Sequence, residues 1–125
     1  MAMTNTTTHP TGVIADHITA VNAFDTEAIM ATFADDAVVN DAHREFWGAD
    51  AIRAWVAKEM VGDHVTVDPV EVLEHHGMTI VRARYDGDYP KDNLPDPLIM
   101  SNYLVVRDER IVALFVIRNT PVEGY

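Results

Sequence analysis

Apolar residues in the first half of the chain recur at the spacing of helices. Between residues 13 and 24 they fall near one face, and His17 lies on the same stripe. This spacing predicts a first helix of about three turns. Asp25 fits the N-cap of a second helix, which we expect to run to about residue 33. Residues 49–60 carry another apolar stripe and predict a third helix.

From residue 64 onward the pattern changes to one typical of strands. A short strand is also expected earlier, over residues 37–41, followed by a polar loop at residues 42–46. Pro69 indicates a bulge or an edge position. The later strands form two hairpins, made by residues 64–75 with 78–86 and by residues 98–107 with 110–118. The order of elements predicts an α+β fold, with three N-terminal helices packed on one face of a strongly curved, mainly antiparallel sheet.

Asp41 ends the short strand and is the first candidate for chemistry. Ala37, Val39 and Asp41 share one face of that strand. A carboxylate in line with inward-facing apolar residues is costly to bury, so it tends to be paired, neutralised or used in chemistry. His17, on the stripe of the first helix, is a candidate helper. A simple ion pair with Arg44 would instead give Asp41 a structural role.

The composition is that of one globular domain. The chain has 125 residues, of which 48% are hydrophobic and 23% charged, enough for a single core. Residues 1–11 predict a flexible N-terminal tail, and residues 12–125 a single domain. The absence of cysteine excludes a disulfide, a thiolate metal site and a cysteine nucleophile. It fits a reducing compartment, and we expect a cytoplasmic protein.

The charge balance narrows the range of partners. Acidic side chains number 20 against 9 basic ones, and the formal net charge is −11. Such a surface repels phosphate backbones and anionic lipid headgroups, so we expect no nucleic acid and no membrane as partners, but a hydrophobic small molecule. His75 and His76 would point to opposite faces of a strand, without a third ligand at a suitable spacing. We therefore expect no metal, and the lack of nucleotide-binding motifs predicts no cofactor.

Four segments carry a recognisable family pattern. They are residues 25–29, 33–41, 47–52 and 110–112. Together they resemble the nuclear transport factor 2-like superfamily, and within it the SnoaL-like polyketide cyclase and ketosteroid isomerase branches. The resemblance covers nearly the whole chain from about residue 12, and it implies a cone-shaped, cystatin-like α+β barrel around an apolar pocket. Proteins of this fold include isomerases, cyclases, dehydratases, hydrolases and non-catalytic binders.

The resemblance implies roles for three residues. Asp41 matches the proton-shuttling aspartate of the isomerase branch. His17 stands where that branch has an oxyanion-hole tyrosine, and Asn102 where it has a protonated aspartic acid. In this interpretation Asp41 and His17 are catalytic: Asp41 moves the proton, and a neutral His17 donates to a substrate carbonyl or carries a second proton. The alternatives are a core histidine and a structural asparagine.

Further side chains complete the predicted substrate site. Trp47 would stack on a planar ligand at the cavity mouth or anchor the third helix. Arg118 would bind a substrate carboxylate or lie at a dimer surface, and His43 follows Asp41 in a loop. Tyr85 and Tyr103 would exchange roles with their neighbours if the strand register differed by one residue. The predicted substrate-binding residues are Asn102, Trp47, Tyr85, Tyr103, His43 and Arg118.

The predicted function is that of a cofactor-independent enzyme. It would carry out isomerisation, aldol-type cyclisation or dehydration on a carbonyl-bearing hydrophobic substrate, with the enolate stabilised by His17 and Asn102. One alternative is a non-catalytic binding or dimerisation module of the same fold. Another is hydrolysis by an activated water, which calls for a second carboxylate or an inward-facing arginine such as Arg82 or Arg84. Apolar residues on both faces of the last two strands predict a homodimer through the sheet.

Overall fold

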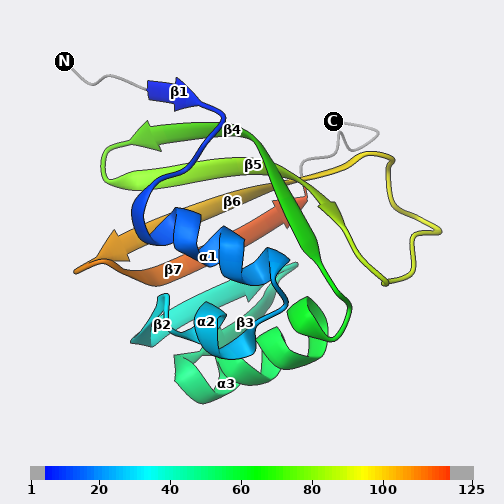
Figure 1. The fold of residues 1–125 in the computed structure, drawn as a ribbon, viewed down its shortest axis with the longest axis horizontal. Coiled ribbons are helices and arrows are strands. Elements are labelled where there is room, and N and C mark those ends of the chain that lie inside the picture. Colours follow the sequence, from blue (N-terminus) through cyan, green and yellow to red (C-terminus); the bar gives the residue numbers. More distant parts are fainter. Residues whose placement is uncertain (1–4, 119–125) are drawn as a thin grey trace.

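Three α-helices and a curved seven-stranded sheet make up residues 5–118, the part of the chain that the computed structural model describes (Figure 1). The helices lie against one face of the sheet. They are α1 (Gly12–Asn22), α2 (Thr26–Met30) and α3 (Gly48–Trp55), and α3 continues as a π-helical segment, η1 (Val56–Val61). The strands are β1 (Asn5–Thr7), β2 (Phe33–Asp41), β3 (Arg44–Trp47), β4 (Thr66–His75), β5 (Met78–Asp86), β6 (Leu98–Arg107) and β7 (Arg110–Arg118).

The sheet is antiparallel except at one strand pair. Its order is β1-β4-β5-β6-β7-β2-β3, and β2 runs parallel to β7. The predicted α+β class, with helices on a curved and mainly antiparallel sheet, is confirmed. One detail differs, because β1 pairs with β4 opposite Val72, Leu73 and Glu74. The described part of the expected N-terminal tail therefore contains a short strand.

The later strands follow the predicted pattern closely. β5, β6 and β7 have the expected bounds, and β4 begins at Thr66. The register of β4 shifts between Pro69 and Glu71, which is the bulge that a proline without an N–H group predicts. The N-cap is also confirmed, since the Asp25 carboxylate accepts a hydrogen bond from the Ala28 amide at 3.0 Å.

The second helix is shorter, and the strand after it longer, than the sequence pattern predicts. α2 ends at Met30, and β2 begins at Phe33, which stands opposite Ile111 of β7. The backbone N–H of Ile111 donates to the Thr32 carbonyl at 2.8 Å. Pairing with β7 thus extends β2 beyond its apolar run, and such tertiary pairing overrides local preference.

The segment expected to be a polar loop is a tight hairpin. Asp41 stands opposite Arg44, and the two residues between them, Ala42 and His43, have φ of 53° and 69°. Positive φ at both central residues is the geometry of a two-residue hairpin turn, for which asparagine and glycine are the usual residues. The residues Ala42 and His43 do not predict such a turn, and for this reason the sequence pattern does not predict strand β3.

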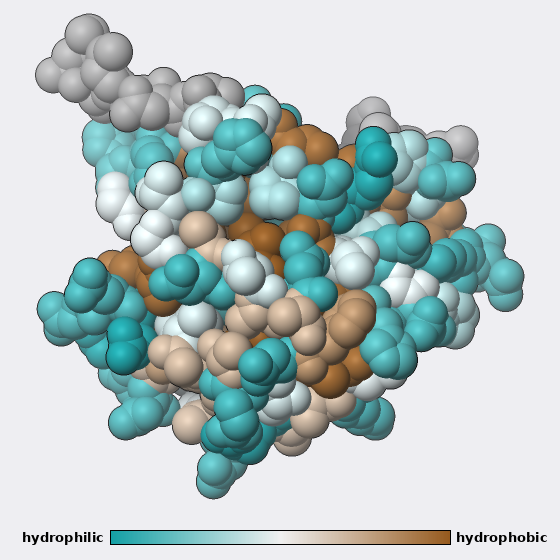
Figure 2. Space-filling view, in the orientation of Figure 1, coloured by the Kyte–Doolittle hydropathy of each residue, from teal (hydrophilic) through white to brown (hydrophobic). Residues whose placement is uncertain are grey.

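The core lies between the helices and the concave face of the sheet. Ala37 and Val39 are fully buried there, as their shared strand face predicts. Hydrophilic residues spread over much of the face seen in Figure 2, and hydrophobic residues show in patches between them. Within residues 5–118, no helix combines the length and the apolar character that crossing a membrane requires.

Candidate functional site

A cavity of about 990 Å³ opens between the helices and the concave face of the sheet. Most of its wall is apolar, and a few polar side chains from distant parts of the chain reach it. This combination is typical of small-molecule sites. The apolar wall includes Ile14, Ile18, Val21, Met60, Val81, Met100, Leu104 and Leu114. The polar lining residues include His17, Asp41, Arg44, Glu59, Tyr85 and Asn102.

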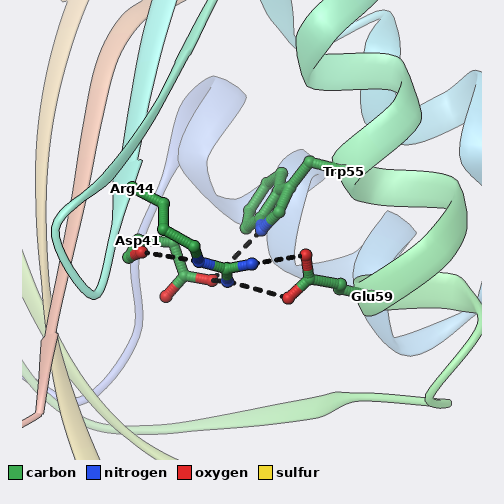
Figure 3. A network of polar contacts seen from close by, with 4 residues as sticks. All are labelled: Asp41, Arg44, Trp55 and Glu59. Atoms are coloured by element: carbon green, nitrogen blue, oxygen red, sulfur yellow. Dashed lines mark hydrogen bonds and ion pairs between the residues drawn. The ribbon is translucent and has the colours of Figure 1, made fainter.

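Asp41 is held at the cavity edge through one carboxylate oxygen (Figure 3). Its Oδ2 accepts from Trp55 Nε1 at 3.1 Å and from Arg44 Nη2 at 2.9 Å. Trp55 itself is buried on α3 and stacks on Phe46, with ring centroids 5.9 Å apart. Oδ1 accepts no hydrogen bond from any residue between 5 and 118. The carboxylate is therefore fixed in place while one oxygen stays available.

Arg44 links Asp41 to a second carboxylate. Its Nη1 and Nη2 donate to the two carboxylate oxygens of Glu59, each at 2.8 Å. The hydrogen bond to Glu59 is the main cause that raises the pKa of Arg44 and, in return, lowers the pKa of Glu59. Both are charged at neutral pH, and the side chain of Arg44 is 49% exposed. Two carboxylates thus share one guanidinium at the water-accessible end of the cavity, which leaves this end negative.

His17 forms part of the buried wall of the cavity. Its Nδ1 lies 2.9 Å from Thr32 Oγ1, and that hydroxyl lies 2.6 Å from the carbonyl oxygen of Ile29. A carbonyl has no hydrogen, so the single hydroxyl hydrogen of Thr32 must point at Ile29, and Thr32 can only accept from His17. Nδ1 therefore carries the proton. Burial lowers the pKa of His17 to about 4, so the neutral ring has a bare lone pair on Nε2.

This hydrogen-bond pattern corrects the predicted donor role of His17. The residue does line the cavity, as its place on the apolar stripe indicates. However, a ring protonated at Nδ1 cannot donate from Nε2, and its one N–H is occupied by Thr32. His17 therefore offers an acceptor, and not a donor, at Nε2.

Asn102 also lines the cavity, and its amide makes two hydrogen bonds. The hydroxyl of Tyr85 donates to Asn102 Oδ1 at 2.6 Å, and Asn102 Nδ2 donates to the Val81 carbonyl at 3.2 Å. These contacts fix the orientation of the amide, and the second hydrogen of Nδ2 meets no acceptor among residues 5–118. Burial is the main cause that raises the pKa of Tyr85, and the charge of Asp41 adds to it, so the phenol stays protonated.

The structure brings most of the predicted site residues together. Six of them line the cavity: Asp41, His17, Asn102, Tyr85, His43 and Arg118. The last two are exposed at its mouth, and His43 stands in the β2–β3 turn. Tyr85 is a lining residue in the predicted register, so no slip of the strand is involved.

Two predicted substrate-binding residues lie elsewhere. Trp47 is 66% exposed, and its indole donates to Glu45 Oε1 at 3.2 Å. Because side chains alternate along β3, Phe46 turns inward to Trp55 and Trp47 turns outward. Tyr103 lies on the face of β6 opposite to Asn102, for the same reason. Neither belongs to the cavity wall.

The sequence pattern missed Glu59, and it gave Arg44 only as the ion-pair partner of Asp41, a pair that the structure contains at 2.9 Å. Glu59 lies four positions after Trp55, one helical turn away, and this spacing is the one local sign that both side chains face Asp41. The inward-facing arginine considered at Arg82 or Arg84 is not found there, because both are exposed and Arg82 pairs with Glu71 at 2.9 Å. Within residues 5–118, no three histidine, aspartate or glutamate side chains are grouped to hold a metal.

Comparison with protein families identifies the family of this chain. The model of the SnoaL-like domain matches residues 14–114. The chain belongs to the SnoaL-like domain family. The predicted family is thereby confirmed, and with it a fold of the polyketide cyclase and isomerase type. No curated protein matches the chain.

Solved structures agree with this SnoaL-like assignment. A candidate polyketide cyclase from Sinorhizobium meliloti is 27% identical, with a TM-score of 0.74 over 83% of this chain and 92% of the other. A protein from Catenulispora acidiphila with a ketosteroid isomerase-like fold, in complex with trimethylamine, is 21% identical, with a TM-score of 0.71 and coverage of 87% and 85%. An epoxide hydrolase/cyclase-like enzyme of pyran ring formation in salinomycin is 16% identical, with a TM-score of 0.71 and coverage of 86% and 88%.

Proposed function

We propose that this SnoaL-like protein is a cofactor-independent enzyme that transfers a proton within a hydrophobic, carbonyl-bearing substrate. The observation that carries the proposal is the placement of Asp41. Its Oδ2 is held by Trp55 and Arg44, and its Oδ1 is free beside a largely apolar cavity. A carboxylate that is fixed in orientation and has one open oxygen suits a general acid/base.

The proposed reaction begins at the carbon next to the substrate carbonyl. Asp41 Oδ1 takes a proton from that carbon, and the electron pair moves onto the carbonyl oxygen. The free N–H of Asn102 donates to this oxygen as its charge develops, and Tyr85 and Val81 keep the amide in place. Asp41 then returns the proton to another carbon in an isomerisation, or to the new alkoxide after an aldol-type ring closure.

Loss of the Asp41 carboxylate tests this proposal. The assay follows exchange of the acidic hydrogens of β-tetralone in heavy water by proton NMR. We expect Asp41→Asn to slow exchange at least about 100-fold, because it removes the general base. Asp68→Asn is the matched control, since Asp68 is an exposed carboxylate on β4 outside the cavity wall. Equal exchange rates in wild type and Asp41→Asn would leave the non-catalytic binding or dimerisation module as the function.

Hydrolysis by an activated water is the second candidate function. It is favoured by the Asp41–Arg44–Glu59 network, which provides the second carboxylate and the arginine that such chemistry calls for. The two functions differ in their need for Glu59. In a hydrolase acting on styrene oxide, Glu59→Gln would slow diol formation about as much as Asp41→Asn. In the proton-transfer enzyme, Glu59→Gln would act only through the position of Arg44.

We also propose that the outer face of the sheet joins two copies of the chain. Ile80, Tyr103 and Phe115 stand side by side across β5, β6 and β7. Phe115 and Ile117 are 41% and 51% exposed on these strands, and apolar rows of this kind support a homodimer. We expect Phe115→Glu to convert a dimer into a monomer in sedimentation experiments. Val70→Glu is the control, at an exposed valine on β4, and a monomeric wild type would contradict the proposal.

A further inference from the structure

The Nε2 atom of His17 is a polar atom without a partner in the dry wall of the cavity. The residue is 7% exposed, and its ring packs edge-on against Phe33 at a centroid distance of 5.3 Å. Nδ1 is turned to Thr32, and residues 5–118 offer no hydrogen bond to Nε2. Ile14, Ile18 and Val21 on the same helix contribute apolar side chains to the surrounding wall.

Because His17 Nε2 can accept a hydrogen bond but cannot donate one, it favours a ligand group that carries a hydrogen-bond donor. Because the Thr32 hydroxyl points at Ile29, Nδ1 holds the only ring proton, and Nε2 offers a lone pair. A buried acceptor left without a donor costs free energy, and an ether or carbonyl oxygen opposite it would bring two lone pairs together. A hydroxyl group satisfies the site. Two other neutral polar side chains of the wall, Tyr85 and Asn102, are already hydrogen-bonded to each other.

We propose that His17 Nε2 accepts a hydrogen bond from a hydroxyl of the substrate, so the substrate class is a hydroxylated carbonyl compound, phenolic, enolic or alcoholic. The inference rests on the proposed function for the carbonyl part. Asn102 donates to the carbonyl oxygen, Asp41 moves the proton, and His17 positions the hydroxyl end of the molecule. A donor and an acceptor at different points of an apolar wall fix the orientation of the substrate.

The proton position on His17 is the first test. Long-range proton–nitrogen NMR spectra of the histidine rings in the unliganded protein should show the proton on Nδ1. Thr32→Val removes the hydroxyl that holds this tautomer while keeping the side-chain shape, and we expect proton density to move to Nε2. Thr79→Val is the matched control, because Thr79 is also buried but bonds to Glu74, outside the cavity. A proton on Nε2 in the wild type would overturn the proposal.

Hydroxyl selection is the second test, and it measures binding alone. The probes are β-naphthol and its methyl ether, which differ only in the hydroxyl hydrogen and one methyl group. We expect the wild type to bind β-naphthol about tenfold more tightly in titration calorimetry, as one hydrogen bond to a buried acceptor predicts. His17→Phe and Thr32→Val should lose this preference, and Thr79→Val should keep it.

Each result decides for or against the inference. Equal affinity for the two probes, no binding of β-naphthol, or a preference that persists in His17→Phe would overturn it. Retention in His17→Phe would mean that another acceptor of the cavity, such as Asp41 Oδ1, binds the hydroxyl. These experiments measure affinity and not proton transfer, so the failure of one proposal can be distinguished from the failure of the other. The wild type could prefer β-naphthol while the exchange of β-tetralone hydrogens did not depend on Asp41. That pair of results would contradict the proton-transfer proposal and would leave His17 as a residue that selects ligands.

Discussion

The charged and the neutral polar side chains of the cavity differ in how they avoid the free-energy cost of burying polar groups. The charged cluster consists of Asp41, Arg44, Trp55 and Glu59, and the neutral cluster comprises two separate hydrogen-bonded pairs, His17 with Thr32 and Tyr85 with Asn102. The Arg44 side chain is 49% and the Asp41 side chain 20% exposed, whereas His17 and Asn102 are each 7% exposed. Ions remain where water reaches them, and the dry wall holds only neutral groups, because burying an unpaired ion costs far more than burying a hydrogen-bonded neutral group.

This difference suits the charged and the neutral cluster to different roles in the proposed function. The charged cluster holds the Asp41 carboxylate in one orientation, which suits the proposed proton transfer. In the neutral cluster the Tyr85 hydroxyl orients the Asn102 amide, and Thr32 fixes the ring proton of His17. Such groups suit the proposed recognition of a substrate, since a fixed donor or acceptor discriminates between ligands.

Acid should destabilise the neutral cluster most, through His17. Burial lowers its pKa from 6.5 to about 4, so between these values the unfolded chain binds a proton that the folded protein does not. The free energy of unfolding therefore falls as pH falls through this window. At about 1.4 kcal/mol for each pKa unit, the loss is about 3 kcal/mol. Urea denaturation near neutral pH and near pH 4 should show a smaller loss in His17→Phe than in wild type. Identical losses would mean that His17 is not buried as a neutral ring.

Replacement of Asn102 should have the next largest effect. Asn102→Leu leaves the buried Tyr85 hydroxyl without its partner and removes a donor to the Val81 carbonyl, which should cost about 2 kcal/mol of unfolding free energy. Tyr85→Phe removes the hydroxyl as well, so the double variant should lose less than the sum of the single variants. Additive losses in urea denaturation would show that the two side chains do not depend on each other.

Changes in the charged cluster should affect stability least. Glu59→Gln weakens the ion pair with Arg44, whose side chain is 49% exposed beside a Glu59 that is 30% exposed. Pairs that water reaches contribute about 0–1 kcal/mol, and salt screens them. We expect a small loss of unfolding free energy that shrinks further in concentrated sodium chloride. If Glu59→Gln lost as much unfolding free energy as Asn102→Leu, the charged cluster would be as well shielded from water as the neutral one.

Local pattern was sufficient to predict most of the fold. The two hairpins, the Asp25 cap and the bulge near Pro69 each depend on a few neighbouring residues, and all are present. The β2–β3 hairpin was missed because Ala42 and His43 adopt positive φ without the residues that favour it. The full length of β2 was missed because it depends on pairing with β7, which lies far along the chain.

The sequence by itself determined that His17, Asp41 and Asn102 face the cavity. Helical period turned His17 inward, and strand alternation did the same for Asp41 and Asn102, because inward and outward positions repeat locally along helices and strands. Only the tertiary structure decided what these side chains offer. His17 is an acceptor because Thr32, 15 residues away, meets its Nδ1. The direction of a hydrogen bond depends on a partner from another element, and packing alone brings the two together.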